Sequence, residues 1–400
     1  MLEGIKVVEM ASIAAGPSAA AILAEWGAEV IKVEPLEGDA GRHTLTGLGV
    51  QDLTDINPEF ELHNRGKRSI AVDLRRPEAH AVVLELISGT DVFITNMQPH
   101  KLEQRGLDWE RMRTLNPRLV YASISGYGLR GADRELPGID HTAFWSRSGL
   151  AGLMAVKGSE PTPIRMAVGD RMTGLALVSG ILAATIGAQK TGKGKLVEVS
   201  LLRTGVYALG TDLGLQMVRG RVGSNKPRHE NVNPYFGFYP TRDNRWLAVQ
   251  LGRADSLPEV LGHPELKDDP RFATPQSRRE HAREVVDIID NITRERTLAE
   301  WCEHLKGHDF PWAPVNSPAD AIADPQVEAA GAFVDVPRRG GEGTFRALAM
   351  PVGFRDADGQ PDGLPRAQAP RIGENTDEIL RALGRGAEEI AALRKAGAVR

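Results

Sequence analysis

Short runs of β-branched and apolar residues alternate with helical patterns over the first 125 residues of the chain. These runs cover residues 6–9, 30–33, 70–74, 92–95 and 119–124. After the first run, Pro17 opens an alanine-rich stretch that ends at Gly27, which is typical of a helix with proline in its first turn and glycine after its last. The alternation favours an α/β fold with an open, mostly parallel sheet and right-handed crossovers.

The pattern of predicted helices, strands and connections changes after about residue 205. Before that point, a long helix is expected over residues 170–189, followed by a strand over 196–201. After it, longer connections surround a hairpin (residues 235–241 and 245–251) and several amphipathic helices. We predict a large domain that begins with residues 1–205, a smaller α+β domain over residues 225–325, and a return to the large domain over residues 326–400.

Helix starts and short strands can also be placed in the second half. Capping boxes are predicted at Ser277 with Glu280 and at Thr297 with Glu300, and Ser317 before Pro318 predicts a third helix start. Residues 334–363 are rich in glycine, proline and charge, which indicates a loop excursion with short strands. Two helices are expected at the end of the chain, over residues 374–383 and 387–396.

Composition excludes several classes of protein. The 49 basic and 53 acidic residues are mixed along the chain, so no basic tract points to nucleic acid or to an anionic membrane. The single cysteine, Cys302, cannot form an intramolecular disulfide, and the first ten residues lack the features of a signal peptide. A cytoplasmic location is therefore expected. The longest apolar stretch, residues 174–188, is shorter than the roughly 20 residues that span a bilayer, so it predicts a buried helix.

Two motifs resemble known sites but have the wrong surroundings. Residues 126–131 match G-x-G-x-x-G, yet the following segment contains Pro137 and has no helical period, which argues against NAD binding. His229 and Glu230 begin like a zinc-binding helix, but Asn233 occupies the position of the second histidine ligand. We therefore expect no metal and no NAD. A buried thiol is expected at Cys302.

Three short stretches are candidates for chemistry. Small residues at 14–18 precede the alanine-rich helix and would let an anion approach its N-terminus, although tight packing explains them equally well. The three cations of residues 64–69 suit a phosphate, or form a solvated loop. Asp140 follows a Pro-Gly pair and precedes Phe144 and Trp145; it is a candidate nucleophile or base, or the first residue of an Asx turn.

These stretches belong to longer phrases that resemble class III CoA-transferases, the CaiB–BaiF family, which includes 2-methylacyl-CoA racemases as a divergent branch. The phrases are W-G-A-E-V-I-K-V-E-P (26–35), N-R-G-K-R-S-I-A-V-D-L (64–74), L-N-P-R-L-V-Y-A-S-I-S-G-Y-G (115–128), T-G-K-G-K-L-V-E-V-S-L-L (191–202) and G-E-N-T-D-E-I-L (373–380). The resemblance implies a large Rossmann-like domain, a smaller central domain and an interlocked homodimer.

The resemblance also implies roles for individual residues. It assigns the role of nucleophile to Asp140, which would form an aspartyl-CoA thioester while CoA moves between an acyl-CoA and a free carboxylic acid. No metal or redox cofactor takes part in that exchange. Backbone N–H groups near residues 14–16 are candidates for stabilising the oxyanion. Contacts to CoA are implied for Ala14, Ala15, Gly16, Lys67, Arg68, Asn96, Met97, Arg105 and Tyr127.

The racemase branch is the alternative function. Its members carry a histidine before the aspartate that matches Asp140, and an aspartate in a later V-G-D. Here Ile139 replaces the histidine and cannot exchange a proton, whereas the V-G-D is present as residues 168–170. The transferase is therefore the favoured prediction, with Asp170 as a helix N-cap. A non-catalytic CoA-binding relative is a third possibility.

The acids exchanged are expected to be 2-hydroxy, aryl or succinyl-type acids, because residues 144–149 and 233–246 resemble the branch that handles them. The predicted acyl pocket consists of Ile139, Phe144, Trp145, Tyr235 and Phe236. The alternative is that these aromatic side chains belong to the cores of the hairpin and the helices.

Overall fold

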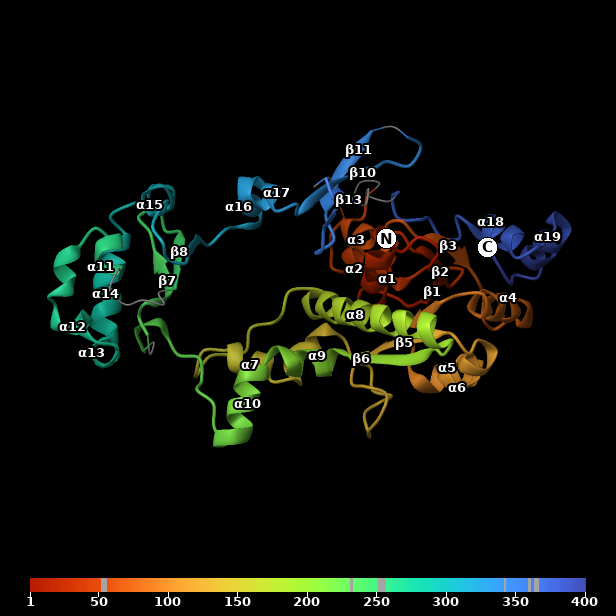
Figure 1. Cartoon of the computed structure of the whole chain (residues 1–400), viewed down its shortest axis with the longest axis horizontal. Helices are drawn as coiled ribbons and strands as arrows, with labels where there is room; N and C mark the ends of the chain where they lie inside the picture. Colours follow the sequence, from red (N-terminus) through yellow and green to blue (C-terminus); the bar gives the residue numbers. More distant parts are fainter. Residues whose placement is uncertain (52–55, 231–232, 251–256, 342, 359–360, 363–366) are drawn as a thin grey trace. The chain divides into compact units, whose positions relative to one another are not determined.

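The computed structural model describes residues 1–51, 56–230, 233–250, 257–341, 343–358, 361–362 and 367–400 (Figure 1). The chain divides into two compact units. The first comprises Met1–Gly152, Thr162–Val222 and Ala330–Arg400, and the second comprises Leu153–Pro161 and Gly223–Ala329. The first unit therefore combines both ends of the chain, and the second comes from its middle.

A six-stranded parallel sheet forms the centre of the first unit. Its strands are β1 (Lys6–Met10), β2 (Glu29–Glu34), β3 (Arg68–Ala71), β4 (Val92–Thr95), β5 (Val120–Ser125) and β6 (Lys195–Ser200), in the order β3-β2-β1-β4-β5-β6. Val8 of β1 pairs with Ile31 on one side and Phe93 on the other. The predicted parallel sheet is confirmed. The strand order reverses between β1 and β4, and such a switch point opens a crevice at the carboxyl ends of the strands.

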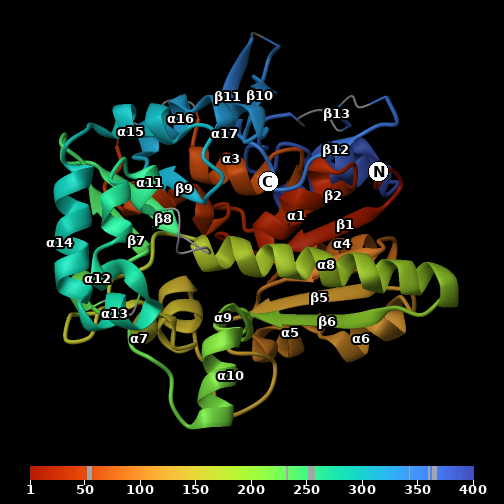
Figure 2. The ribbon, with the colours of Figure 1, turned by 60° about the vertical axis from the view of Figure 1, so that its left-hand side comes forward.

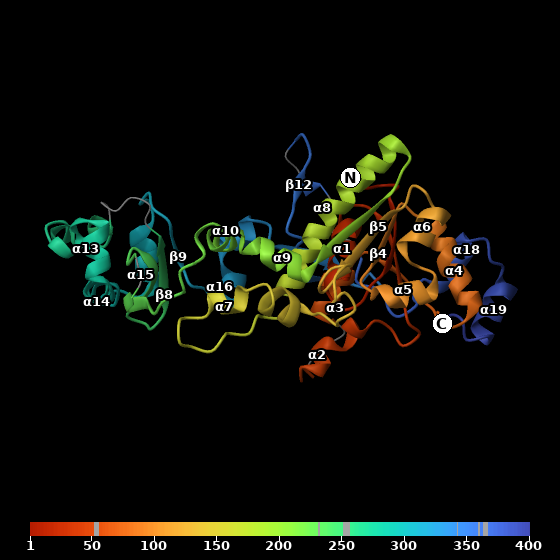
Figure 3. The same cartoon turned by 90° about the horizontal axis from the view of Figure 1, so that it is seen from below.

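Helices cover both faces of this sheet (Figure 3). On one face, α1 (Ala15–Glu25) and α8 (Val168–Thr191) pack on the apolar side chains of Val7, Val92 and Val120. On the other face lie α4 (Pro77–Ser88), α5 (Pro99–Arg105), α6 (Trp109–Leu115), α18 (Thr376–Ala382) and α19 (Ala387–Lys395). The C-terminal helices thus complete the core that the N-terminal strands begin.

The long helix α8 lies along β5 and β6 (Figure 2). It begins at Val168 and not at residue 170, with Ala167 in the left-handed region at its N-cap. Asp170 lies inside the first turn, so its predicted role as N-cap is wrong. Among the described residues α8 is the one helix whose length and composition would suit a membrane span. Its side chains Leu177, Val178 and Ile181 are buried in the core, as predicted for this stretch.

The remaining elements of the first unit are short. They are η1 (Ala40–His43), α2 (Thr44–Gly47), α3 (Pro58–Asn64), η2 (Asp140–Ser146), α9 (Leu201–Ala208), α10 (Gly210–Arg219), β10 (Phe333–Pro337), β11 (Thr344–Leu348), β12 (Phe354–Arg355) and β13 (Pro361–Asp362), and α7 (Leu150–Met154) begins in this unit and ends in the second. The last four strands form two antiparallel pairs in the segment that was predicted as a loop excursion with short strands.

The second unit has a three-stranded antiparallel sheet beside helices. The predicted hairpin is confirmed as β7 (Phe236–Pro240) and β8 (Trp246–Gln250), to which the three-residue strand β9 (Trp312–Pro314) is added. The helices are η3 (Arg228–Glu230), α11 (Leu257–Val260), η4 (Pro264–Lys267), α12 (Pro270–Ala273), α13 (Pro275–Glu280), α14 (Ala282–Thr293), α15 (Leu298–Leu305), α16 (Pro318–Ala323) and α17 (Pro325–Ala329).

The predicted helix caps of this unit have different outcomes. The capping box of Thr297 with Glu300 and the cap at Ser317 are confirmed. The box at Ser277 with Glu280 is wrong, because Ser277 is the inner partner of a box that begins at Thr274. Pro275 explains the difference, since proline is favoured at the first helical position and so places the helix start three residues earlier than predicted.

Candidate active site

A cavity of about 460 Å³ lies at the carboxyl ends of β1, β2, β3 and β4, where the strand order predicts a crevice. Its lining includes three of the residues predicted to contact CoA: Asn96, Met97 and Arg105. The Asn96 side chain accepts a hydrogen bond from Ser12 N at 3.1 Å and donates one to Ser12 O at 2.9 Å. Asn96 therefore fixes the turn after β1, which is a structural role compatible with lining a ligand site.

Arg75 is a cavity residue that the sequence analysis missed. It follows β3, and its guanidinium is largely exposed and pairs with the Asp73 carboxylate at 2.8 Å. An exposed guanidinium at the mouth of a crevice is suited to a phosphate. Its sequence position could have identified it, because Arg75 directly follows a predicted strand and therefore lies at the same edge of the sheet as Asn96.

Lys67 differs from the other predicted CoA contacts because its ammonium is fully buried. It lies 2.7 Å from Glu9 and also donates to the carbonyl oxygens of Pro17 and His63. Burial lowers the pKa of Lys67 to about 8, although the Glu9 carboxylate opposes this. A direct contact with CoA stays a prediction, and in this structure the ammonium holds other parts of the protein together.

Two further buried charges join this pair. Lys32 Nζ lies 3.0 Å from Glu9 and 2.7 Å from Asp39, and it donates to Ala11 O. Burial disfavours the charged amine, but Glu9 and Asp39 outweigh it and raise the pKa of Lys32. We refer to Glu9, Lys32, Asp39 and Lys67 as the buried quartet. Its two positive and two negative charges compensate one another in the interior.

The buried quartet holds the predicted oxyanion turn from several sides. Asp39 Oδ1 accepts from Ile13 N at 3.0 Å, while Lys32 and Lys67 donate to Ala11 O and Pro17 O. Ile13 has a φ of 70°, a strained conformation for a β-branched residue that the surrounding contacts must maintain. Ala14 is the N-cap of α1, and Ala15 and Gly16 lie in its first turn. The quartet therefore preorganises this turn.

Close packing explains the glycine of the turn. A Cβ atom on Gly16 would overlap the side chain of Ala11, so tight strand-to-helix packing, the alternative considered for this stretch, accounts for Gly16. A Cβ atom on Gly174 of α8 would likewise overlap Ser18 Oγ and Ala15 O. The first turn of α1 consequently meets α8 one helical turn after Asp170.

Asp140 accepts hydrogen bonds at the N-terminus of α8. Its Oδ1 and Oδ2 lie 3.1 and 3.2 Å from Gly169 N, and a Cβ atom on Gly169 would overlap this carboxylate and the Phe144 ring. Burial raises the pKa of Asp140, while the N–H groups of Gly169 and its neighbours oppose that shift. Free N–H groups at a helix start stabilise a carboxylate, so Asp140 acts as a cap supplied from another segment. It opens the π-helical segment η2, a rare conformation often found at functional sites.

Asp170 is the second carboxyl group of this region. In the described part of the chain its side chain has no hydrogen bond or ion pair. Burial, and then the charge of Asp140, raise the pKa of Asp170 to about 7. Two carboxyl groups with raised pKa values, next to each other and at a helix start, are typical of a functional site.

A guanidinium accompanies the two carboxyl groups. Arg171 Nη2 lies 2.7 Å from Glu59 Oε2, and Arg171 Nε donates to His63 Nε2 at 3.2 Å. Glu59 and His63 occupy one face of α3, four residues apart. Burial, and then the positive charge of Arg171, lower the pKa of His63 to about 3, so the imidazole is neutral. Sequence analysis missed all three residues, because they come from segments more than 100 residues apart.

Other predicted site residues lie elsewhere. Arg68 is at the amino end of β3, pairs with Glu378 at 2.8 Å, and is therefore at the sheet edge opposite Asn96. Tyr127 stacks beneath the guanidinium of Arg147, 4.9 Å from its ring centroid. In this structure neither residue lines the crevice cavity.

The residues of the predicted acyl pocket belong to both units, and each is described within its own unit. Phe144 is buried against Gly169, whereas Ile139 is exposed. Trp145 Nε1 donates to Thr162 O at 2.8 Å. Tyr235 is buried in the core of the second unit, where Arg278 stacks on its ring, so the structure favours the core alternative for this residue, and its place in a pocket stays a prediction. Phe236 is exposed on β7.

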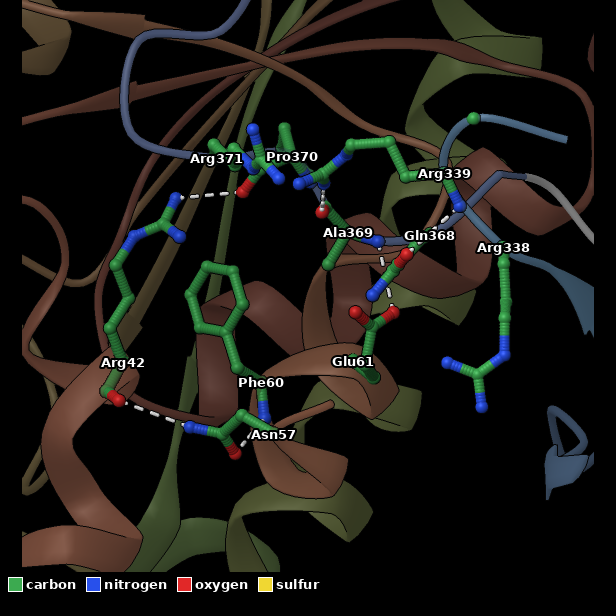
Figure 4. A pocket seen from close by; sticks show the side chains of 11 residues that line it. Arg42, Asn57, Phe60, Glu61, Arg338, Arg339, Gln368, Ala369, Pro370 and Arg371 are labelled. Atoms are coloured by element: carbon green, nitrogen blue, oxygen red, sulfur yellow. Dashed lines mark hydrogen bonds between the residues drawn. The ribbon is translucent and has the colours of Figure 1, made fainter. Parts of the chain in front are cut away.

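A larger cavity of about 860 Å³ contains none of the predicted site residues (Figure 4). Arg42 stacks over the Phe60 ring at 4.1 Å and pairs with Glu34 at 2.7 Å, and Glu61 accepts from Ala369 N at 2.9 Å. Several polar groups of the lining are hydrogen-bonded to one another, among them Arg42 to Pro370 O and Arg339 to Ala369 O. These bonds connect the N-terminal helices to the C-terminal segment, so we assign the lining a structural role. No cluster of metal-binding side chains occurs among the described residues.

Comparison with known proteins decides the family. The model of CoA-transferase family III matches residues 2–376. This chain belongs to that family. The chain is 33% identical over 396 residues to (R)-2-hydroxy-4-methylpentanoate CoA-transferase of Clostridioides difficile, covering 98% of this chain and 97% of the relative. It is 32% identical over 404 residues to cinnamoyl-CoA:phenyllactate CoA-transferase of Clostridium sporogenes, covering 99% and 96%.

A solved structure agrees with this family assignment. The crystal structure of a CaiB/BaiF family protein from Brucella suis superposes with a TM-score of 0.83 at 30% identity, over 96% of this chain and 99% of that one. The predicted CoA-transferase is thereby confirmed as the activity of this chain, and the α/β fold is that of the family.

Proposed function

We propose that this CoA-transferase moves CoA between an acyl-CoA and a free acid through an aspartyl-CoA thioester, with 2-hydroxy, aryl or succinyl-type acids as substrates. The observation that carries the proposal is the pair Asp140 and Asp170 at the start of α8, one turn before α8 meets the first turn of α1. The substrates follow from the names of the relatives, which act on 2-hydroxy-4-methylpentanoate and phenyllactate.

The chemistry needs a carboxylate that can reach a thioester carbonyl. A carboxylate oxygen attacks the acyl carbon, the CoA thiolate leaves, and a mixed anhydride forms. The thiolate then attacks the aspartyl carbonyl, which releases the donor acid and leaves an aspartyl-CoA thioester. The acceptor acid repeats the two steps in reverse. The N–H groups near residues 14–16, in the turn that the buried quartet holds in place, are candidates for stabilising the developing oxyanion.

The contacts favour Asp170 over the predicted Asp140 as the attacking group. Both oxygens of Asp140 are bonded to Gly169 N, and its carboxylate is buried. Asp170 has no such bonds among the described residues, and its raised pKa makes it the more basic carboxylate. In this proposal Asp140 caps α8 and raises the pKa of Asp170, and Asp170 carries CoA.

Peptide mass spectrometry separates the two carboxylates. Trypsin would release Asp140 in the peptide 135–147 and Asp170 in the peptide 166–171. After incubation with a panel of acyl-CoAs and rapid quenching, we expect a CoA adduct on the second peptide that hydroxylamine removes. An adduct on the first peptide would restore Asp140 as nucleophile. Turnover by wild-type protein without an adduct on either would overturn the covalent route.

The crevice cavity is proposed as the CoA site. Asn96, Met97, Arg105 and Arg75 line it, and its position at the switch point of a parallel sheet is where such folds bind nucleotide-like ligands. We retain the predicted assignment of residues 1–205 and 326–400 to the CoA-binding domain and of 225–325 to the smaller one.

A homodimer in the cytoplasm completes the proposal. Tyr207, Met217 and Val218 on α9 and α10 are each more than 80% exposed, and apolar surface of this kind is typical of an interface. Sedimentation at nanomolar concentration should show a dimer that does not dissociate without unfolding. A stable folded monomer would contradict it. Cell fractionation checks the location.

A further inference from the structure

We propose that Arg171 binds the carboxylate of the acceptor acid and so determines that this enzyme passes CoA to an anionic acceptor. The inference deepens the proposed function and rests on it. No sequence pattern singled out Arg171, because its importance comes from its contacts with α3 and from its place after Asp170.

The guanidinium of Arg171 is held from one side and open on another. Nη2 is engaged by Glu59 at 2.7 Å and Nε by His63 at 3.2 Å. Nη1 has a long contact of 3.4 Å with Met166 O. The side chain is about a third exposed, at 35%, and Nη1 has only this long contact among the described residues, so it is the nitrogen left to bind a ligand. A guanidinium that is oriented in advance loses little entropy when it binds a carboxylate.

His63 fixes the orientation of Arg171 as a neutral acceptor. Its Nε2 receives the Arg171 Nε–H, so the proton of the neutral ring is assigned to Nδ1, which lies 3.6 Å from Glu59 Oε1. The groups that face this assembly are Asp140 from η2, Asp170 from α8, Glu59 from α3 and, behind His63, the ammonium of Lys67. Arg171 contacts the Glu59 carboxylate directly, and its positive charge acts on Asp140 and Asp170 without a hydrogen bond to either in the described part of the chain.

The second half of the reaction, in which CoA passes to the acceptor acid, brings a further negative charge into a site that already contains carboxylates, so it requires a compensating cation. The acceptor arrives as a carboxylate and must approach the aspartyl-CoA carbonyl beside Asp140 and Glu59. Burial raises the pKa of Glu59, as it does those of Asp140 and Asp170, so uncompensated negative charge is costly here. Arg171 supplies the compensating charge. In this step the acceptor oxygen forms the bond to the aspartyl carbon and the CoA thiolate leaves.

The two half-reactions test this role separately. Replacing Arg171 with Met should raise the KM for the acceptor acid about 10- to 100-fold, the loss expected for a charge-assisted hydrogen bond. Formation of the CoA adduct from acyl-CoA should change less than about threefold. Arg171→Lys should recover part of the acceptor affinity. Arg165→Met, which removes an exposed arginine six residues earlier, is the matched control and should behave as wild type.

The outcomes distinguish a failure of the proposed role of Arg171 from a failure of the proposed covalent route. An Arg171→Met variant with normal acceptor KM would overturn the role of Arg171, and so would one in which adduct formation and acceptor use fall equally. A wild-type enzyme that forms no adduct would contradict the proposed covalent route, whatever the Arg171 variants do. Circular dichroism and thermal melting of the variants show whether folding is intact.

Discussion

The Lys67 ammonium lies 2.7 Å from the Glu9 carboxylate, and both side chains are completely buried. Fifty-eight residues separate the two in sequence. The pair joins β1 to the segment before β3, and through Pro17 O it also contacts the start of α1. A basic residue that the family resemblance assigned to CoA thus stabilises the turn that the chemistry requires.

Replacing Lys67 with Met should lower the free energy of unfolding by about 3–5 kcal/mol, because Glu9 would keep only Lys32 as a buried partner. Urea unfolding measures this. Arg75→Met, which removes an exposed pair, should leave the free energy of unfolding nearly unchanged, because solvent screens exposed charges. Equal losses in the two variants would contradict the importance of burial.

Asp170 should reduce the stability of the folded protein at neutral and alkaline pH. Its pKa is about 7 in the folded state against 3.8 for the free side chain, so between these values the folded state binds more protons than the unfolded state. The free energy of unfolding therefore falls as pH rises through this range. Asp170→Asn should melt at a higher temperature than wild type at pH 8, with a smaller difference at pH 4.5. Thermal melts at both pH values test this, and a pH-independent difference would contradict it.

Arg75 should contribute to CoA binding. Because it lines the crevice cavity with an exposed guanidinium, Arg75→Met should raise the KM for acyl-CoA about 10-fold with little change in kcat. The KM for the acceptor acid should not change. Arg68→Met, at the opposite edge of the sheet, is the control and should retain the wild-type KM for acyl-CoA.

The α-carbon of the substrate should remain untouched. Ile139 cannot exchange a proton, and CoA transfer involves only the carbonyl carbon. Turnover of a 2-methylacyl-CoA in deuterium oxide should therefore incorporate no α-deuterium, and the kinetics with a free acid should be ping-pong. Mass spectrometry of the recovered acyl group measures this. Rapid deuterium incorporation without CoA transfer would favour racemisation instead.

The sequence by itself determined the parts of this protein whose signal is local. The β-branched runs identified five of the parallel strands, because a strand that is buried on both faces is recognisable from its own continuous apolar composition. Turn chemistry placed the β7–β8 hairpin and the Thr297 cap. It misplaced the cap near Ser277 and missed β9, because three residues carry too little periodicity to identify a strand.

Only the tertiary structure decided which side chains share a site. Arg171 meets Glu59 across 112 residues and His63 across 108, and no local pattern relates them. Burial of Lys67 and Tyr235 is likewise a tertiary property, because their own sequence positions do not show it. The position of Asp170 inside the first turn of α8, and not at its cap, also became clear only in the structure. Protonation, exposure and partner choice depend on the desolvation and charge that distant segments bring together, and these exist only after the chain has folded.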